Sequence, residues 1–276
     1  MHLNARAYPA HAPFDRSKPA VLTALHAFWT RGRPVERAAY VVSGILLASG
    51  LIHLALLLVG DASWAGPRSL RKPMTFGLSF GLTTLTIVWV STFLQLGERV
   101  RTWLLALFTG ASVLETALVS LQAWRGVPSH FNLETTFDAW VTRMLAGGGI
   151  TLVVIVVALT WLSFRKSTTP ISLRVAIRVG FVALYVALLS GGLMIARGTQ
   201  LVLAGNLETA YATGGSLRPT HGVFMHGILV LPLLAWMLSF VPMTEKHRLN
   251  VVITAAVIYL VLACAIAAAN LTGLLS

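Results

Sequence analysis

AAYVVSGILLASGLIHLALLLV, residues 38–59, contains no Asp, Glu, Lys or Arg and a single histidine. A helix of this length, rising about 1.5 Å per residue, crosses the roughly 30 Å hydrocarbon core of a lipid bilayer. Six more apolar runs of similar length follow, at residues 74–96, 102–123, 139–164, 176–196, 221–241 and 251–274. The sequence therefore predicts an all-α fold, a polytopic membrane helical bundle with about seven transmembrane helices.

The composition agrees with a membrane protein. Hydrophobic residues make up 56% of the chain, charged residues make up 11%, and the mean hydropathy is +0.78, which is more apolar than soluble domains are. The formal net charge is +12, but the basic residues stand singly near the ends of the apolar runs. This placement favours contact with anionic membrane lipid and argues against nucleic acid as a partner.

Two segments are expected. Residues 1–37 carry several prolines and scattered charge without an apolar core long enough for a signal peptide, so we interpret them as a cytoplasmic N-terminal lead. Within this lead, Leu22, Leu25 and Trp29 share one helical face, as an interfacial helix requires; a short connector ahead of the first span is the alternative. Residues 38–276 form the seven-helix transmembrane domain.

Basic residues predict the orientation of the chain. With the N-terminus inside, fourteen Lys and Arg residues fall on the cytoplasmic side and six fall outside. The positive-inside rule thus favours a cytoplasmic N-terminus and an extracytoplasmic C-terminus. Arginine greatly outnumbers lysine, which is typical of GC-rich bacterial genomes, so we expect a multi-pass protein of the bacterial plasma (inner) membrane.

Polar residues within the apolar runs collect toward the predicted outer side. His53 and His226 lie about six residues, or roughly 10 Å, below the outer ends of their spans, and Glu115 lies roughly 12 Å below its own. Arg143, one turn into the fourth span, is placed to reach toward Glu115. Because ionisable residues inside a membrane are energetically expensive, they mark a functional site by default.

The connection at residues 124–138, WRGVPSHFNLETTFD, adds to this outer polar layer. Asn132 or Thr135 is placed to cap the fourth span, but capping leaves most of the polar residues unexplained. Five outer-face candidates lie here or on the adjoining helix: Gln122, Ser129, His130, Asn132 and Asp138. Arg125 is a further candidate, and Arg218 and His221 at the head of the sixth span complete the set.

Three strings carry a family resemblance: KPMTF at 72–76, QAWRGVPSHFN at 122–132 with TTFD at 135–138, and LRPTHGVFMHGILVLPLLAW at 217–236. Together they resemble an uncharacterised family of bacterial, largely actinobacterial, multi-pass membrane proteins. The resemblance covers most of residues 40–270. It implies the architecture and the outer-face signature, and it implies no chemistry.

The interpretation that these residues favour is binding of a b-type haem or a metal in membrane redox, with two other classes of function as alternatives. His53 and His226 at matched depth are suited to ligate a b-type haem, with Arg143 and Arg125 near its propionates. A divalent metal held by His53, His226 and Glu115 is the neighbouring hypothesis. A carrier would instead take a small polar or anionic solute from the extracytoplasmic side, with Glu115 and Arg143 as a proton-linked pair.

A non-catalytic membrane assembly subunit is the fourth hypothesis. The sequence identifies no catalytic residue, and it leaves both enzymatic activity and the oligomeric state open.

Overall fold

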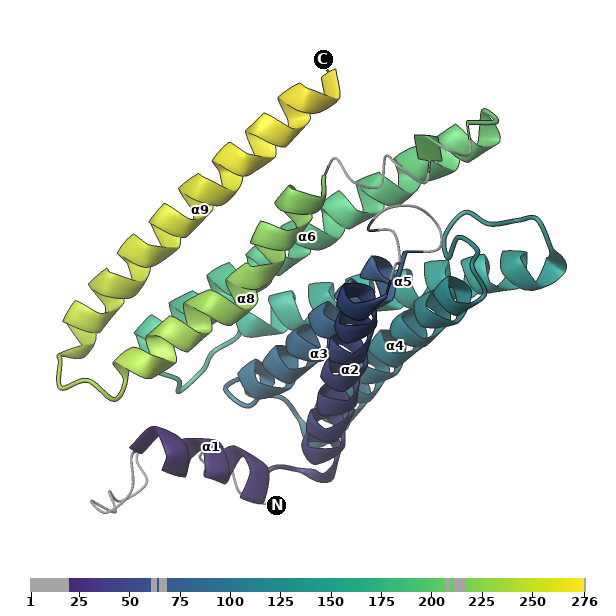
Figure 1. Ribbon diagram of the computed structural model, residues 1–276. Helices are drawn as coiled ribbons and strands as arrows, with labels where there is room; N and C mark the ends of the chain where they lie inside the picture. The colour runs from purple at the N-terminus through teal and green to yellow at the C-terminus, as the bar shows by residue number, and fades with distance from the viewer. Residues whose placement is uncertain (1–19, 61–63, 65–68, 207–208, 211–216, 276) are drawn as a thin grey trace.

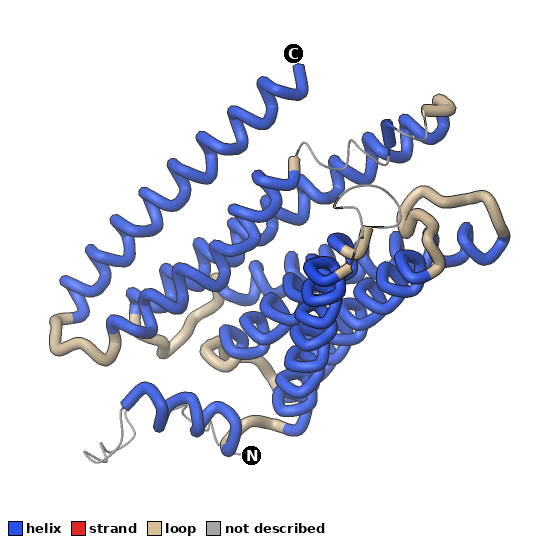
Figure 2. The backbone as a smooth tube through the Cα atoms, viewed as in Figure 1, coloured by secondary structure: helices blue, strands red, loops and turns tan. Residues whose placement is uncertain are grey.

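The computed structural model describes residues 20–60, 64, 69–206, 209–210 and 217–275. In these residues the chain forms helices and no strand (Figures 1 and 2). The helices are α1 (Ala20–Thr30), α2 (Pro34–Val59), α3 (Arg71–Ser91), α4 (Glu98–Trp124), α5 (Thr136–Ser163), α6 (Ile171–Leu203), α8 (Arg218–Leu238) and α9 (Glu245–Leu275). Residues 1–19 of the predicted N-terminal lead lie outside the described residues.

Seven of these helices, α2 to α6, α8 and α9, are long and apolar enough to cross a membrane. The predicted all-α, seven-span architecture is therefore confirmed. The largest difference in bounds is at α6, which begins at Ile171 and ends at Leu203 and so extends beyond the apolar run at residues 176–196.

The seven helices run alternately up and down, so the bundle has two ends. We call the end that carries residues 125–135 the polar-loop end; α2, α4, α6 and α9 finish there, and α3, α5 and α8 begin there. We call the opposite end the aromatic end, after the ring cluster described below. Charge counts alone assign the two ends to the two sides of the membrane.

The helices associate in two groups, which Figure 1 shows as α2 to α5 (purple to teal) beside α6, α8 and α9 (green to yellow). Within the first group, α2 and α3 approach so closely that a Cβ at Gly77 would lie 2.6 Å from the backbone nitrogen of Gly50. Within the second, a Cβ at Gly180 of α6 would lie 2.9 Å from the Cα of Ile228. These glycines allow the backbones to touch, which is how membrane helices associate when lipid is as apolar as the side chains.

The hydrophobic core is continuous at the aromatic end and divided at the polar-loop end. One cluster joins both groups and includes Ile87 of α3, Leu159 of α5 and Leu231 of α8. Toward the polar-loop end, separate clusters belong to single groups: one around Val119 on α4 and α5, the other around Phe224 on α6, α8 and α9. The two groups are thus fastened at the aromatic end, while their other ends have separate cores.

Helix α1 lies across the aromatic end (Figure 1). Its Phe28 packs edge-on against Trp89 and Phe93 of the α3 end, with ring centroids 6.4 and 6.0 Å away, and also against Trp236 of α8 at 6.2 Å. The predicted apolar face of Leu22, Leu25 and Trp29 is exposed, so it points away from the protein. Helix α1 therefore contacts both helix groups through Phe28, and its second apolar face is exposed.

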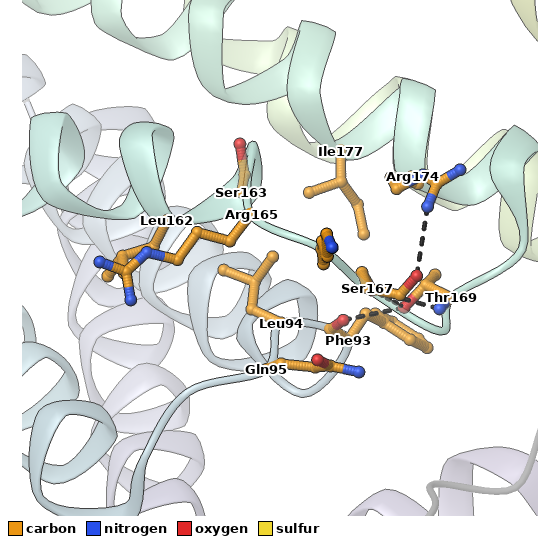
Figure 3. Close-up of a pocket in the computed structure, with 11 residues that line it drawn as sticks. Phe93, Leu94, Gln95, Leu162, Ser163, Arg165, Ser167, Thr169, Arg174 and Ile177 are labelled. Carbon is orange, nitrogen blue, oxygen red and sulfur yellow. Dashed lines mark hydrogen bonds between the residues drawn. The ribbon is translucent and has the colours of Figure 1, made fainter.

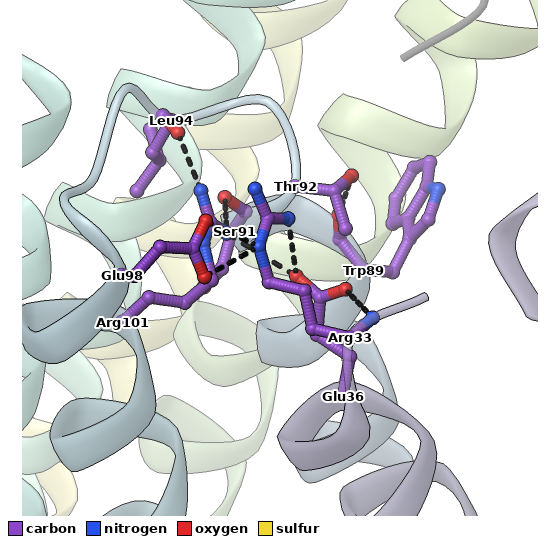
Figure 4. A network of polar contacts seen from close by, with 8 residues as sticks. All are labelled: Arg33, Glu36, Trp89, Ser91, Thr92, Leu94, Glu98 and Arg101. Carbon is purple, nitrogen blue, oxygen red and sulfur yellow. Dashed lines mark hydrogen bonds and ion pairs between the residues drawn. The ribbon is translucent and has the colours of Figure 1, made fainter. Parts of the chain in front are cut away.

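A buried ion pair ties α2 to the turn between α3 and α4 (Figure 4). Glu36 of α2 and Arg101 of α4 are both buried, and their Oε1 and NH1 atoms are 3.4 Å apart. The Arg101 guanidinium also donates to the carbonyl oxygens of Ser91 at 2.6 Å and Leu94 at 3.0 Å. One arginine therefore donates to two buried carbonyls where α3 ends, of the kind that a helix terminus leaves without a full set of partners.

A cavity of about 10 Å³ lies at the same end, between the turns that follow α3 and α5 (Figure 3). Thr169 donates to the Phe93 carbonyl at 2.9 Å, and Arg174 donates to the Ser167 carbonyl at 3.2 Å. These bonds hold the α5–α6 turn against the end of α3. The cavity is the size of about one water molecule, so it is too small for a larger ligand.

Candidate functional site

The first polar group at the polar-loop end centres on Lys72, in the first turn of α3. Its Nζ donates to Ser129 Oγ at 2.6 Å and lies 3.1 Å from His130 Nδ1. A lysine ammonium can only donate, so His130 Nδ1 accepts and its ring proton is assigned to Nε2. Two predicted candidates, Ser129 and His130, are thereby gathered around a lysine that the sequence analysis did not select.

His130 is held in its neutral form. Burial in the loop, and next the nearby Lys72 ammonium, lower the pKa of His130 well below its ordinary value. The ring of Phe76 packs edge-on against it, with centroids 6.1 Å apart. Because the neutral ring keeps Nδ1 as an acceptor, the contact with Lys72 persists at physiological pH.

The loop that carries these residues folds inward. Phe131 adopts a φ of 64°, which turns the chain in the left-handed region, and its ring lies where a Cβ on Gly198 of α6 would be, 2.5 Å away. Asn132 is fully buried, and its Oδ1 accepts from the Glu134 backbone nitrogen at 3.1 Å. The loop thus bridges from α4 to α6, and only a glycine at position 198 leaves room for Phe131.

A second polar group joins the end of α4 to the start of α5. Gln122 donates to Asp138 Oδ1 at 2.8 Å, and Arg125 forms an ion pair with the same carboxylate. Thr135 donates to Asp138 Oδ2 at 2.6 Å, and its own oxygen accepts from the Asp138 nitrogen, which confirms Thr135 as the helix cap. Gln122, Arg125 and Asp138 were predicted as site residues, and this geometry gives all three a structural role.

Glu115 differs from these residues. It is buried in α4, it packs against Gly148 of α5, and its Oε1 has no hydrogen-bond partner among the described residues. The predicted pairing with Arg143 is wrong: Arg143 is exposed, and in the described part of the chain it forms no ion pair. Position 143 lies on a face of α5 that points away from Glu115, whereas the charge of Lys72 does act on it.

His53 and His226 do not face each other. His53 is buried between α2 and α4: its Nδ1 bonds the Ser49 carbonyl at 2.8 Å, and its Nε2 accepts from Trp124 Nε1 at 3.0 Å. His226 lies on α8, where it is exposed and lines a cavity whose other wall is α3. Both ring nitrogens of His53 are engaged within the protein, so this geometry gives no support to axial ligation of a haem.

The predicted metal set is likewise not assembled. In the part of the chain that the structure describes, no three His, Cys, Asp or Glu side chains are grouped so as to hold a metal ion. This range includes His53, Glu115 and His226. His221 also has a packing role, because its Nδ1 bonds the Ala187 carbonyl of α6 at 2.8 Å.

Cations from both helix groups meet at the polar-loop end. The charges of Arg71 and Lys72 on α3 act on Arg218 at the start of α8, and among the acids that the structure describes Glu115 is the one whose charge acts on Lys72. Arg71 also lies over the ring of Trp64, 5.7 Å from its centroid. We call Arg71, Lys72 and Arg218 the cationic rim.

A hydroxyl face continues from the rim down α3. Lys72, Ser79, Thr83 and Thr86 fall within about 60° of one another at 100° per residue. The three hydroxyl residues line a cavity of about 20 Å³ whose other wall is α8, including His226. Sequence reasoning missed this face, although its spacing of four and three residues, in register with Lys72, was a signal that could have found it.

No protein-family model matches this chain, no curated protein matches it, and no solved structure matches it. Inference about function therefore rests on the geometry. Of the predicted site residues, Ser129 and His130 meet at Lys72, and Gln122, Arg125 and Asp138 meet in a structural network. Glu115 remains buried without a full set of partners.

Proposed function

We propose that this membrane protein is a carrier that takes up a small anionic solute at its polar-loop end. The observation that carries the proposal is the cationic rim, which draws Arg71 and Lys72 from one helix group and Arg218 from the other. A rim built from both groups lies where an entering solute would bridge them.

The charge balance at the rim favours an anion. Two unit charges 4 Å apart interact by about 4 kcal/mol at the effective dielectric constant found near protein surfaces. Among the described residues, the charges that act on the Lys72 ammonium come from two arginines and one acid, so the surroundings of Lys72 favour an anion. Lys72 can donate three hydrogen bonds, of which Ser129 and His130 accept two, so one remains for a ligand.

Glu115 supports a proton-linked carrier. A buried carboxyl group in a membrane span is expensive unless it is used, and such residues mark ion and proton pathways by default. Its Oε1 lacks a partner among the described residues, and the charge of Lys72 acts on it. We infer that Glu115 exchanges a proton as the solute binds or leaves the rim.

The division of the core supports alternating access. Carriers commonly move one group of helices against another around a site between them. Here the two groups share one core at the aromatic end and have separate cores at the polar-loop end. Rocking about the shared core would open or close the rim without breaking either separate core, although it would separate Phe131 of the loop from Gly198 of α6.

The side of entry follows from charge counts. The positive-inside rule, with fourteen basic residues against six, favours the polar-loop end as the outer one. We therefore propose uptake from outside across a bacterial plasma membrane, with the N-terminus in the cytoplasm.

The test measures the thermal midpoint of the purified protein with phosphate, sulfate, acetate or lactate, followed by uptake of any stabilising anion into proteoliposomes. An anion at a hundred times its Kd should stabilise by about 2.7 kcal/mol. Lys72→Gln should weaken the binding of that anion at least about tenfold. The matched control is Arg143→Gln, an exposed cation of the same end that lacks an ion pair in the described residues.

If none of these anions shifts the thermal midpoint, the rim is not an anion site and the proposal fails. The proposal fails likewise if Lys72→Gln and Arg143→Gln weaken anion binding equally.

A further inference from the structure

The cavity between α3 and α8 is polar on one wall. Ser79, Thr83 and Thr86 of α3 line it, and His226 and Met225 of α8 are opposite, with apolar residues completing the lining. Ser79 lies eight residues after Arg71, and His226 lies eight residues after Arg218, which places both about 12 Å from the polar-loop end. The cavity is thus inside the membrane-spanning part, below the cationic rim.

The hydrogen bonds of this face are incomplete. Serine and threonine in a membrane helix usually donate to the carbonyl four residues earlier, as Thr75 and Thr86 do at 2.8 Å. No hydrogen bond joins Ser79 or Thr83 to any described residue through its hydroxyl. His226 bonds the Gly222 carbonyl through Nδ1 at 2.6 Å, and this leaves Nε2 free to accept.

Unsatisfied polar groups are costly at this depth. Within a bilayer each one costs several kcal/mol, because no bulk water is present to replace the missing partner. A water molecule needs a cavity of roughly 10–15 Å³ and two to four polar partners. The cavity measures about 20 Å³ and offers two hydroxyls and one imidazole nitrogen, so it meets both conditions.

The lining also excludes other ligands. No Asp, Glu, Lys or Arg lines the cavity, so neither a metal ion nor the anion of the rim finds a charged partner there. Helix α3 brings no titratable side chain to it, and on α8 the nearest titratable neighbour of His226 is His221, whose charge interacts with it. A neutral molecule of this size that both donates and accepts hydrogen bonds is water.

We propose that the α3–α8 cavity is a water-binding site, held by Ser79, Thr83 and His226. The water lies below the cationic rim on the same face of α3 and above the shared core, which closes the aromatic end at Ile87 and Leu231. The presence of this water does not depend on the proposed carrier function.

Radiolytic footprinting of the full chain in lipid nanodiscs tests the proposal. X-ray pulses in ¹⁸O-labelled water generate hydroxyl radicals at bound waters, and mass spectrometry reads ¹⁸O incorporation into methionine. Met225 lines the cavity, whereas Met144 of α5 has a similar depth and packs against an apolar cluster. Met225 should become oxidised at least about fivefold faster than Met144.

A double variant, Ser79→Ala with Thr83→Val, removes two of the three polar partners and none of the hydrogen bonds described above. It should keep its thermal midpoint and lower the Met225 rate to that of Met144. Equal rates in the unaltered protein would show a dry cavity and overturn the proposal. So would a Met225 rate that the double variant leaves unchanged. Fast labelling of Met225 without anion binding at the rim would retain the water site and refute only the carrier.

Discussion

Removing Arg101 should be among the most damaging single substitutions in this protein. Arg101→Met leaves Glu36 buried without its 3.4 Å partner and takes the donor from the Ser91 and Leu94 carbonyls. Breaking a buried ion pair by removing one partner costs about 3–5 kcal/mol when the remaining charge is uncompensated, and here Arg33, 3.2 Å from the same Glu36 oxygen, keeps part of the compensation, so we expect the lower end of that range. At about 2–4 °C per kcal/mol, the thermal midpoint should fall by roughly 10 °C.

A double variant distinguishes the loss of charge pairing from the loss of packing. Replacing both members of a buried pair by apolar residues is often neutral, so Arg101→Met with Glu36→Met should recover much of the loss. The capping bond from the Arg33 nitrogen to Glu36, 2.8 Å long, is lost in this variant, which leaves a deficit of about 1 kcal/mol.

The assay is unfolding in mixed micelles titrated with dodecyl sulfate, for the unaltered protein, both single variants and the double variant. The double variant should be more stable than the sum of the single effects by at least about 2 kcal/mol. Additivity within about 0.5 kcal/mol would refute the coupling.

Three further outcomes are expected. Phe28→Ala should release α1 from both helix groups, at up to about 3 kcal/mol, and speed hydrogen exchange of residues 20–30, whereas Leu22→Ala on the exposed face should not. The lowered pKa of His130 means that the unfolded chain binds a proton there at higher pH than the folded chain does. Stability should therefore fall as the pH drops below about 6.5, and His130→Gln should flatten that part of a pH series of thermal midpoints, with the exposed His247→Gln as the control. A periplasmic reporter fused after Ser276 should be active, and one fused within residues 165–175 should be inactive; the reverse pattern would invert the orientation.

The number and positions of the spans follow from sequence alone, because the length of an apolar run is a local property that the bilayer thickness selects. The cap at Thr135 was also predictable, since it depends on residues within one turn of the helix. Polar residues in the loop at 124–138 were expected in one polar layer, and near neighbours among them do contact one another, as Ser129 and His130 do.

Pairings between spans were decided only by the tertiary structure. His53 bonds Trp124 instead of facing His226, and Glu115 lies against Gly148 instead of Arg143. Depth along a helix can be counted from sequence, but rotation about the helix axis cannot, because helices that are apolar all round carry no stripe that marks an inner face. The direction of each polar side chain is therefore set by which helices become neighbours. Close backbone packing at glycines determines which helices are neighbours.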